Sequence, residues 1–132
     1  MMSEIIDNLF IGDQQDAAQA PLTMWVINVL EGHAPEQRGM LMWLPILPPG
    51  GPPAERAMLD AAITHIDRLL GMGHKVLVHC GAGVERSPLT VAWYLREKSG
   101  MDWDQAYALL REKRPVVQDR REWAPFSKDI AP

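Results

Sequence analysis

The chain of 132 residues has little of several features that place a protein in a broad class. Its one cysteine, Cys80, excludes a disulfide within the chain and is typical of a reducing cytosol. No apolar run approaches the ~20 residues that span a bilayer, and the first four residues lack the basic and apolar parts of a signal peptide. We therefore expect a cytoplasmic protein with no membrane partner.

Positive charge and metal-binding patterns are also scarce. The formal net charge is −4 at pH 7, which argues against nucleic acid as the main partner. The four histidines show no spacing that a metal site requires: His33, His65, His74 and His79. We expect a monomer that uses neither a metal nor another cofactor.

The pattern of apolar residues predicts one domain, residues 1–132, with alternating strands and helices. Strands are expected at 9–11, 24–29, 40–44 and 75–79, and helices at 13–20, 54–70, 87–98, after Asp102 and at 120–128. Asp13 and Asp102 are the expected N-caps of their helices, the latter with Gln105. Together these elements predict an α/β fold with a central, mostly parallel sheet of four or five strands and helices on both faces.

The stretch 75–88, KVLVHCGAGVERSP, carries the chemistry. Its short β-branched and apolar run predicts a buried strand, which a loop of small residues follows. Pro88 stands where the first turn of a helix tolerates proline. In such a turn, backbone N–H groups and the positive end of the helix dipole converge on one point. We call residues 80–86 the Cys80 loop and expect it to bind an anion.

Three side chains could carry out a reaction at this anion site. Cys80 stands at the mouth, where donors that bind an oxyanion also stabilise a thiolate. The planar fork of Arg86 can hold two phosphate oxygens, and Ser87 can donate a hydrogen bond to the sulfur. The alternative is a glycine-rich turn with a merely buried cysteine, and Arg86 argues against it.

The pattern His79-Cys80, five residues, then Arg86-Ser87 resembles the signature loop of the cysteine-based protein tyrosine phosphatases. The flanking sequence is most similar to their compact dual-specificity branch. Residues 5–12 resemble its opening strand, 25–29 its second strand and 43–46 the strand that leads to its acid loop. The resemblance implies a catalytic domain that hydrolyses phosphotyrosine in proteins or small aryl phosphates.

The resemblance also implies a two-step mechanism. Cys80 attacks phosphorus to give a cysteinyl-phosphate, which water then hydrolyses. Arg86 and the loop amides hold the equatorial oxygens, and His79 is similar to the family histidine that helps to keep the thiolate charged. The phosphate-binding positions are Gly81, Ala82, Gly83, Val84, Glu85 and Arg86.

One part of the family's machinery is missing from its expected place. The family uses an aspartate that should fall at about 48–50, but residues 41–54 contain no carboxylate. Glu55 and Glu85 are the main substitutes for this general acid, and Glu31, Glu36 and Asp119 are others. The alternative for Glu85 is a solvent-facing carboxylate paired with a nearby arginine.

The loss of the acid bears on the substrate. A positioned general acid is worth roughly 10²–10⁴-fold, and aryl phosphates depend on it less than seryl or threonyl phosphates. We therefore expect a preference for phosphotyrosine and other aryl phosphates. Glu85 disfavours multiply phosphorylated inositol lipids, which need extra positive charge at such a loop.

Two other classes of function remain open from the residues. A Cys80 loop without an acid could be a phosphotyrosine-binding module with little turnover, although a pure binder gains nothing from a reactive thiol. Sulfur or arsenate chemistry, as in rhodaneses and arsenate reductases, uses a similar loop. The His-Cys and Arg-Ser pairs favour a phosphatase, and an arsenate reductase usually needs resolving cysteines that this chain lacks.

Overall fold

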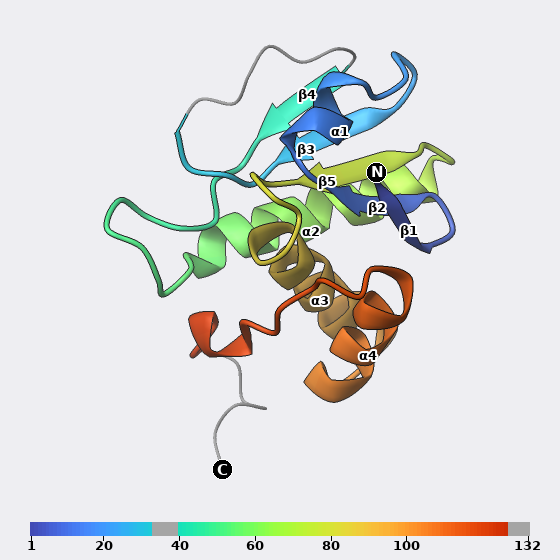
Figure 1. Cartoon of the computed structure of the whole chain (residues 1–132). Coiled ribbons are helices and arrows are strands. Elements are labelled where there is room, and N and C mark those ends of the chain that lie inside the picture. The colour runs from blue at the N-terminus through green and yellow to red at the C-terminus, as the bar shows by residue number, and fades with distance from the viewer. Residues whose placement is uncertain (33–39, 127–132) are drawn as a thin grey trace.

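The computed structural model describes residues 1–32 and 40–126. It has a five-stranded sheet with helices on both faces, which confirms the predicted α/β class (Figure 1). The elements in chain order are β1 (Ser3–Ile6), β2 (Leu9–Gly12), α1 (Gln14–Ala18), β3 (Trp25–Asn28), β4 (Met40–Trp43), α2 (Arg56–Gly71), β5 (Val76–His79), α3 (Arg86–Ser99), α4 (Trp103–Lys113) and the 3-10 helix η1 (Arg121–Trp123).

The sheet is mostly parallel and has β5 at its centre. The strand order is β1-β2-β5-β3-β4, and only β1 runs antiparallel to its neighbour. Gly12 of β2 and Asn28 of β3 both lie in register with His79, the last residue of β5. The residue after β5, Cys80, therefore emerges at the carboxyl edge of the sheet, where open α/β sheets bind ligands.

Alternation along the strands divides the apolar residues between two layers. Val76 and Val78 belong to the main core, which α2 and α3 complete. Leu77 points to the other face and packs with Ala17 of α1 and Val26 of β3. Figure 1 shows the same division, with α1 on one side of the sheet and α2 and α3 on the other.

The predicted helix caps are confirmed. Asp13 accepts a hydrogen bond from the backbone N–H of Asp16, whose carboxylate accepts one from the N–H of Asp13. Asp102 and Gln105 form the same reciprocal box at the start of α4. Each box satisfies N–H groups that the first helical turn leaves without a partner.

Two predicted elements differ in the structure. The predicted opening strand is a hairpin of β1 and β2, turned by Asn8 in the left-handed region with φ 70°. The helix predicted at 120–128 is wrong in its described part, because only η1 is helical and Pro125 follows it closely. Residues 127 and 128 lie outside the described residues. In the part of the chain that the structure describes, no helix is both long and apolar enough to cross a bilayer.

Candidate active site

The Cys80 loop joins the central strand to a buried helix. β5 is buried along its whole length, and α3 buries Ser87, Pro88 and Leu89 in its first turn. These two elements fix both ends of the loop. In Figure 1 the loop leaves β5 and curls back above the start of α3.

Three carbonyl groups of the loop accept hydrogen bonds from outside it. The N–H of Gln14 donates to the oxygen of Gly81 at 3.1 Å, and the N–H of Gln118 donates to that of Val84 at 2.9 Å. Nε of Arg114 donates to the oxygen of Gly83 at 2.9 Å. These contacts come from α1, from the segment after α4 and from the end of α4.

The amide groups of the loop are left for another acceptor. Among the described residues, none of the backbone N–H groups of 81–86 donates to a backbone or side-chain acceptor. Buried or half-buried backbone donors seldom go without an acceptor. With carbonyls bound outside and amides unused, the loop can bind an oxyanion at the start of α3.

Cys80 lies at the point where the loop closes. Its side chain is buried, and the backbone N–H of Ser87 donates to its Sγ at 3.4 Å. The Oγ of Ser87 also lies 3.4 Å from the sulfur. The structure thus brings Ser87 to the sulfur, where its hydroxyl and amide can stabilise a thiolate.

His79 is fully buried beneath the loop. Its Nδ1 lies 3.3 Å from the carbonyl oxygen of Cys80. Burial lowers the pKa of His79, although this contact and the charges of Asp13 and Asp16 oppose the shift. The ring is therefore neutral at neutral pH and has a fixed position next to the backbone of the cysteine.

Arg86 is held by a carboxylate from another part of the chain. Nη2 of Arg86 lies 2.6 Å from Oε1 of Glu31, and its Nε donates to Oε2 at 3.2 Å. The carboxylate uses one edge of the guanidinium, and the N–H groups on Nη1 and the second on Nη2 remain. Glu31 was among the sequence candidates for the general acid, and the structure pairs it with Arg86.

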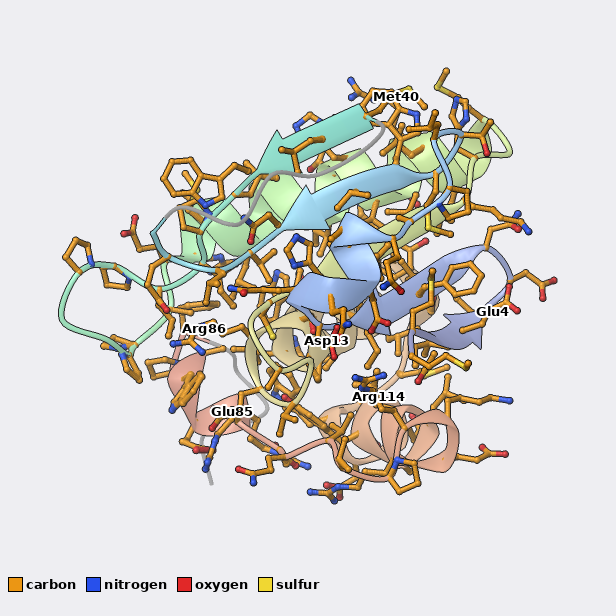
Figure 2. The ribbon with its side chains drawn as sticks, turned by 45° about the horizontal axis from the view of Figure 1, so that its top comes forward. Glu4, Asp13, Met40, Glu85, Arg86 and Arg114 are labelled. Carbon is orange, nitrogen blue, oxygen red and sulfur yellow. The ribbon has the colours of Figure 1, made fainter. Side chains whose placement is uncertain are left out.

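Glu85 forms an ion pair with Arg120 and not with Arg86. Nε of Arg120 donates to Oε2 of Glu85 at 2.7 Å, and the same guanidinium lies over the ring of Trp123. Figure 2 shows Glu85 toward the segment that carries η1, whereas Arg86 lies toward the chain that precedes α2. The alternative stated for Glu85, a carboxylate paired with an arginine, describes its geometry.

Of the remaining acid candidates, Glu55 lies beside the site without a partner. It is exposed at the N-cap of α2, and its carboxylate makes no hydrogen bond or ion pair within residues 1–32 and 40–126. Together with Glu31 it lines a pocket of about 240 Å³. Asp119 is bound to Arg121 by hydrogen bonds of 2.6 to 3.2 Å, and Glu36 lies outside the described residues.

Sequence reasoning missed the residues that shape the loop from outside. Arg114 donates to Gly83 and also, through Nη1, to Ser3 Oγ and the carbonyl of Met1. Figure 2 shows Arg114 and Asp13 on the same side of the molecule as the loop. In the sequence, Arg114 directly precedes Pro115, and this position gives no indication that its side chain reaches the loop. No group of acidic residues, histidines and cysteine in the described segments could hold a metal ion.

Comparison with known proteins finds one family. Residues 52–124, more than half of the chain, match the family model of the dual specificity phosphatase catalytic domain. Human dual specificity protein phosphatase 16 is 36% identical over 59 residues, which are 45% of this chain and 9% of that protein. Human serine/threonine/tyrosine-interacting protein is 30% identical over 132 aligned residues, which cover 86% of this chain and 56% of that protein.

Solved structures show the same fold. Human DUSP28 superposes with a TM-score of 0.78 and 21% identity, over 94% of this chain and 88% of that one. The chain spans about half or less of the length of the curated relatives described above.

Proposed function

Because the chain belongs to the dual specificity phosphatase catalytic-domain family, we propose that it hydrolyses phosphate monoesters through a covalent intermediate on Cys80. The observation that carries this proposal is that one turn holds the Cys80 sulfur, Arg86 and the amides of residues 81–86, which have no acceptor among the described residues. The catalytic unit is residues 1–132 as a single domain. The substrate is a phosphorylated protein or a small aryl phosphate. The enzyme acts as a monomer in the cytoplasm and needs no cofactor.

In the first step the Cys80 thiolate attacks phosphorus. The new S–P bond forms as the P–O bond to the leaving group breaks, and the leaving oxygen takes a proton. The phosphoryl oxygens bind the N–H groups of residues 81–86 and the donors that Glu31 leaves on Arg86. These donors face the charge that develops in the transition state, which is the largest source of stabilisation in such sites.

In the second step water attacks the phosphorus of cysteinyl-phosphate. The O–P bond forms, the S–P bond breaks, and inorganic phosphate leaves the loop. The sulfur leaves as a thiolate that accepts hydrogen bonds from the amide and hydroxyl of Ser87. Neutral His79 keeps the backbone of Cys80 in place during both steps.

We propose Glu55 as the general acid of the first step. Glu85 and Asp119 are already bound to arginines, and Glu31 holds Arg86. Glu55 is exposed beside the pocket it shares with Glu31, so a proton on it can reach a leaving group there. An exposed acid at a helix start is less well positioned than a buried one, which supports a preference for aryl over seryl or threonyl esters.

A phosphotyrosine-binding module with little turnover is the second candidate. The absence of a carboxylate from residues 41–54 favours it, as does the similarity to a human protein named for interacting with serine, threonine and tyrosine. Such a module needs the amides and Arg86 but has no use for the thiolate.

The test is the pH dependence of para-nitrophenyl phosphate and phosphotyrosine hydrolysis. We expect no turnover by Cys80→Ser, and a bell-shaped profile of kcat for the wild type that loses its basic limb in Glu55→Gln. Glu85→Gln, the matched control, keeps that limb. A phosphoserine peptide hydrolysed as fast as a phosphotyrosine peptide contradicts the proposed selectivity. Phosphotyrosine bound by the wild type without Cys80-dependent turnover would establish the binding module instead.

A further inference from the structure

An apolar pocket lies beside Glu31, which contacts Arg86 of the Cys80 loop, and beside the proline-rich segment 45–53. Its volume is about 240 Å³, and its apolar lining includes Trp43, Pro45, Pro48 and Met58. Ligand pockets for drug-sized molecules are roughly 300–1,000 Å³. This pocket therefore suits a single side chain.

The walls of the pocket are fixed by hydrogen bonds. The N–H of Glu55 donates to the oxygen of Ile46 at 2.7 Å, and the N–H of Ile46 donates to that of Val29 at 3.3 Å. Nε1 of Trp43 donates to the oxygen of Leu30 at 2.8 Å, although the side chain is 48% exposed. A large aromatic side chain held in place at the surface is a common anchor for a bound partner.

The pocket and the proposed phosphate site share one residue. Glu31 lines the pocket and at the same time contacts Arg86 at 2.6 Å. A molecule that places its phosphate on Arg86 therefore brings its neighbouring atoms to the mouth of the pocket. The occupant is for this reason a part of the phosphorylated substrate.

Charged residues at the edge of the pocket determine which charge is favoured on the substrate residues next to the phosphorylated one. The carboxylate of Glu31 is neutralised by Arg86, whereas that of Glu55 has no partner among the described residues. An acidic substrate residue near Glu55 meets a like charge, and a basic one meets its complement.

We propose that this pocket receives a bulky apolar side chain from the residue next to the phosphorylated one, in a substrate whose flank is basic rather than acidic. The inference rests on the proposed function, because it takes the Cys80 loop as the place where the phosphate binds. Burial of the side chain favours binding by removing apolar surface from water.

The experiment compares phosphotyrosine peptides that differ at one neighbouring position. Leu and Ala are placed before or after the phosphotyrosine in otherwise identical Gly-Ser peptides. For the wild type, Leu at one of the two positions raises kcat/KM about tenfold over Ala. The preference for a basic flank is measured on binding, where Glu55 transfers no proton. For Cys80→Ser, the peptide with Arg at the adjoining position has a several-fold lower dissociation constant than the peptide with Glu, and this ratio approaches one when Glu55→Gln is added.

The variants locate the effect in the pocket. Trp43→Ala and Met58→Ala reduce the Leu/Ala ratio to less than about threefold, and Trp43→Phe and Met58→Leu restore it. Leu22→Ala, an exposed apolar residue between α1 and β3, is the matched control and keeps the wild-type ratio. Cys80-dependent hydrolysis of para-nitrophenyl phosphate shows that each variant is folded.

The two proposals fail separately. A wild-type enzyme that hydrolyses the Leu and Ala peptides at equal kcat/KM overturns the pocket, while the phosphatase stands on its Cys80-dependent turnover. If no turnover occurs, the dissociation constants of the same peptides for Cys80→Ser test the pocket directly. Equal constants for Leu and Ala, or a ratio that Trp43→Ala in the Cys80→Ser background leaves unchanged, overturn it.

Discussion

Both carboxylate oxygens of Glu31 contact the guanidinium of Arg86. Oε1 lies 2.6 Å from Nη2, and Oε2 accepts a hydrogen bond from Nε at 3.2 Å. The two residues lie 55 positions apart in the sequence. The side chain of Arg86 is 26% exposed and that of Glu31 is 37% exposed, so the ion pair is neither fully buried nor fully solvated. We expect Glu31 to orient Arg86.

Glu31→Gln tests whether orientation or competition dominates. Loss of the charged contact loosens Arg86, and a pair of this exposure contributes up to about 1 kcal/mol. We expect the inhibition constant of inorganic phosphate to rise about fivefold, which corresponds to that energy. A fall in the inhibition constant would mean instead that Glu31 competes with phosphate for the arginine.

Gly83→Ala is expected to destabilise the Cys80 loop. Gly83 has φ +70°, and a Cβ there would lie 2.8 Å from the backbone of Gly12 and from Nη2 of Arg114. Strain of this kind costs about 1–3 kcal/mol, so the melting temperature falls by several degrees. Gly81→Ala is the control for stability, since a Cβ at Gly81 meets nothing within 4 Å. Equal melting temperatures for the two variants would contradict this account of the loop.

Arg114→Gln removes the side chain that holds the carbonyl of Gly83 from outside. A hydrogen bond from a charged donor contributes about 1.5–3 kcal/mol. We expect the free energy of unfolding to fall by about 2 kcal/mol and the affinity for inorganic phosphate to weaken, measured by denaturant titration and calorimetry. Lys113→Gln removes the same charge from an exposed position one residue earlier and should change neither. Unaltered phosphate affinity in Arg114→Gln would show that the loop keeps its shape without this contact.

The buried His79 predicts how stability depends on pH. Burial lowers its pKa in the folded chain, while the unfolded chain titrates near about 6.5. Between these two values the unfolded chain binds more protons, so stability is present above about pH 6.5 and is lost as the pH falls. The melting temperature should therefore drop between about pH 7.5 and about pH 5.5, and drop less in His79→Asn. His65→Asn, at a partly exposed position on α2, should keep the wild-type drop. A wild-type drop in His79→Asn would assign the dependence to other groups.

Local features of the fold could be predicted because local rules determine them. The apolar run before Cys80 predicts a buried strand. Asp13 and Asp102 can be predicted as helix N-caps from the two or three residues next to each. The hairpin at Asn8 was missed because its turn has no glycine, and an asparagine in the left-handed region gives a weak signal. The helix predicted at 120–128 was wrong in its described part, because Pro125 interrupts that range.

The site could be predicted only in its contiguous part. Cys80, Arg86 and Ser87 stand within eight residues, so their grouping follows from one turn. The partners of Arg86, Gly83 and Glu85 come from distant segments, namely Glu31, Arg114 and Arg120. Long-range pairing of charged residues leaves no periodic trace in the sequence, so the partner of each arginine could not be predicted.

The central claim is that Cys80 carries the phosphoryl group during turnover. The direct measurement is rapid acid quench of the wild type during hydrolysis of para-nitrophenyl phosphate, followed by mass spectrometry of the peptide that contains Cys80. The account predicts one phosphoryl group on the Cys80 sulfur, which decays as phosphate is released and is absent from Cys80→Ser. Hydrolysis at the wild-type rate by Cys80→Ser, or a phosphoryl group on another residue, would contradict it.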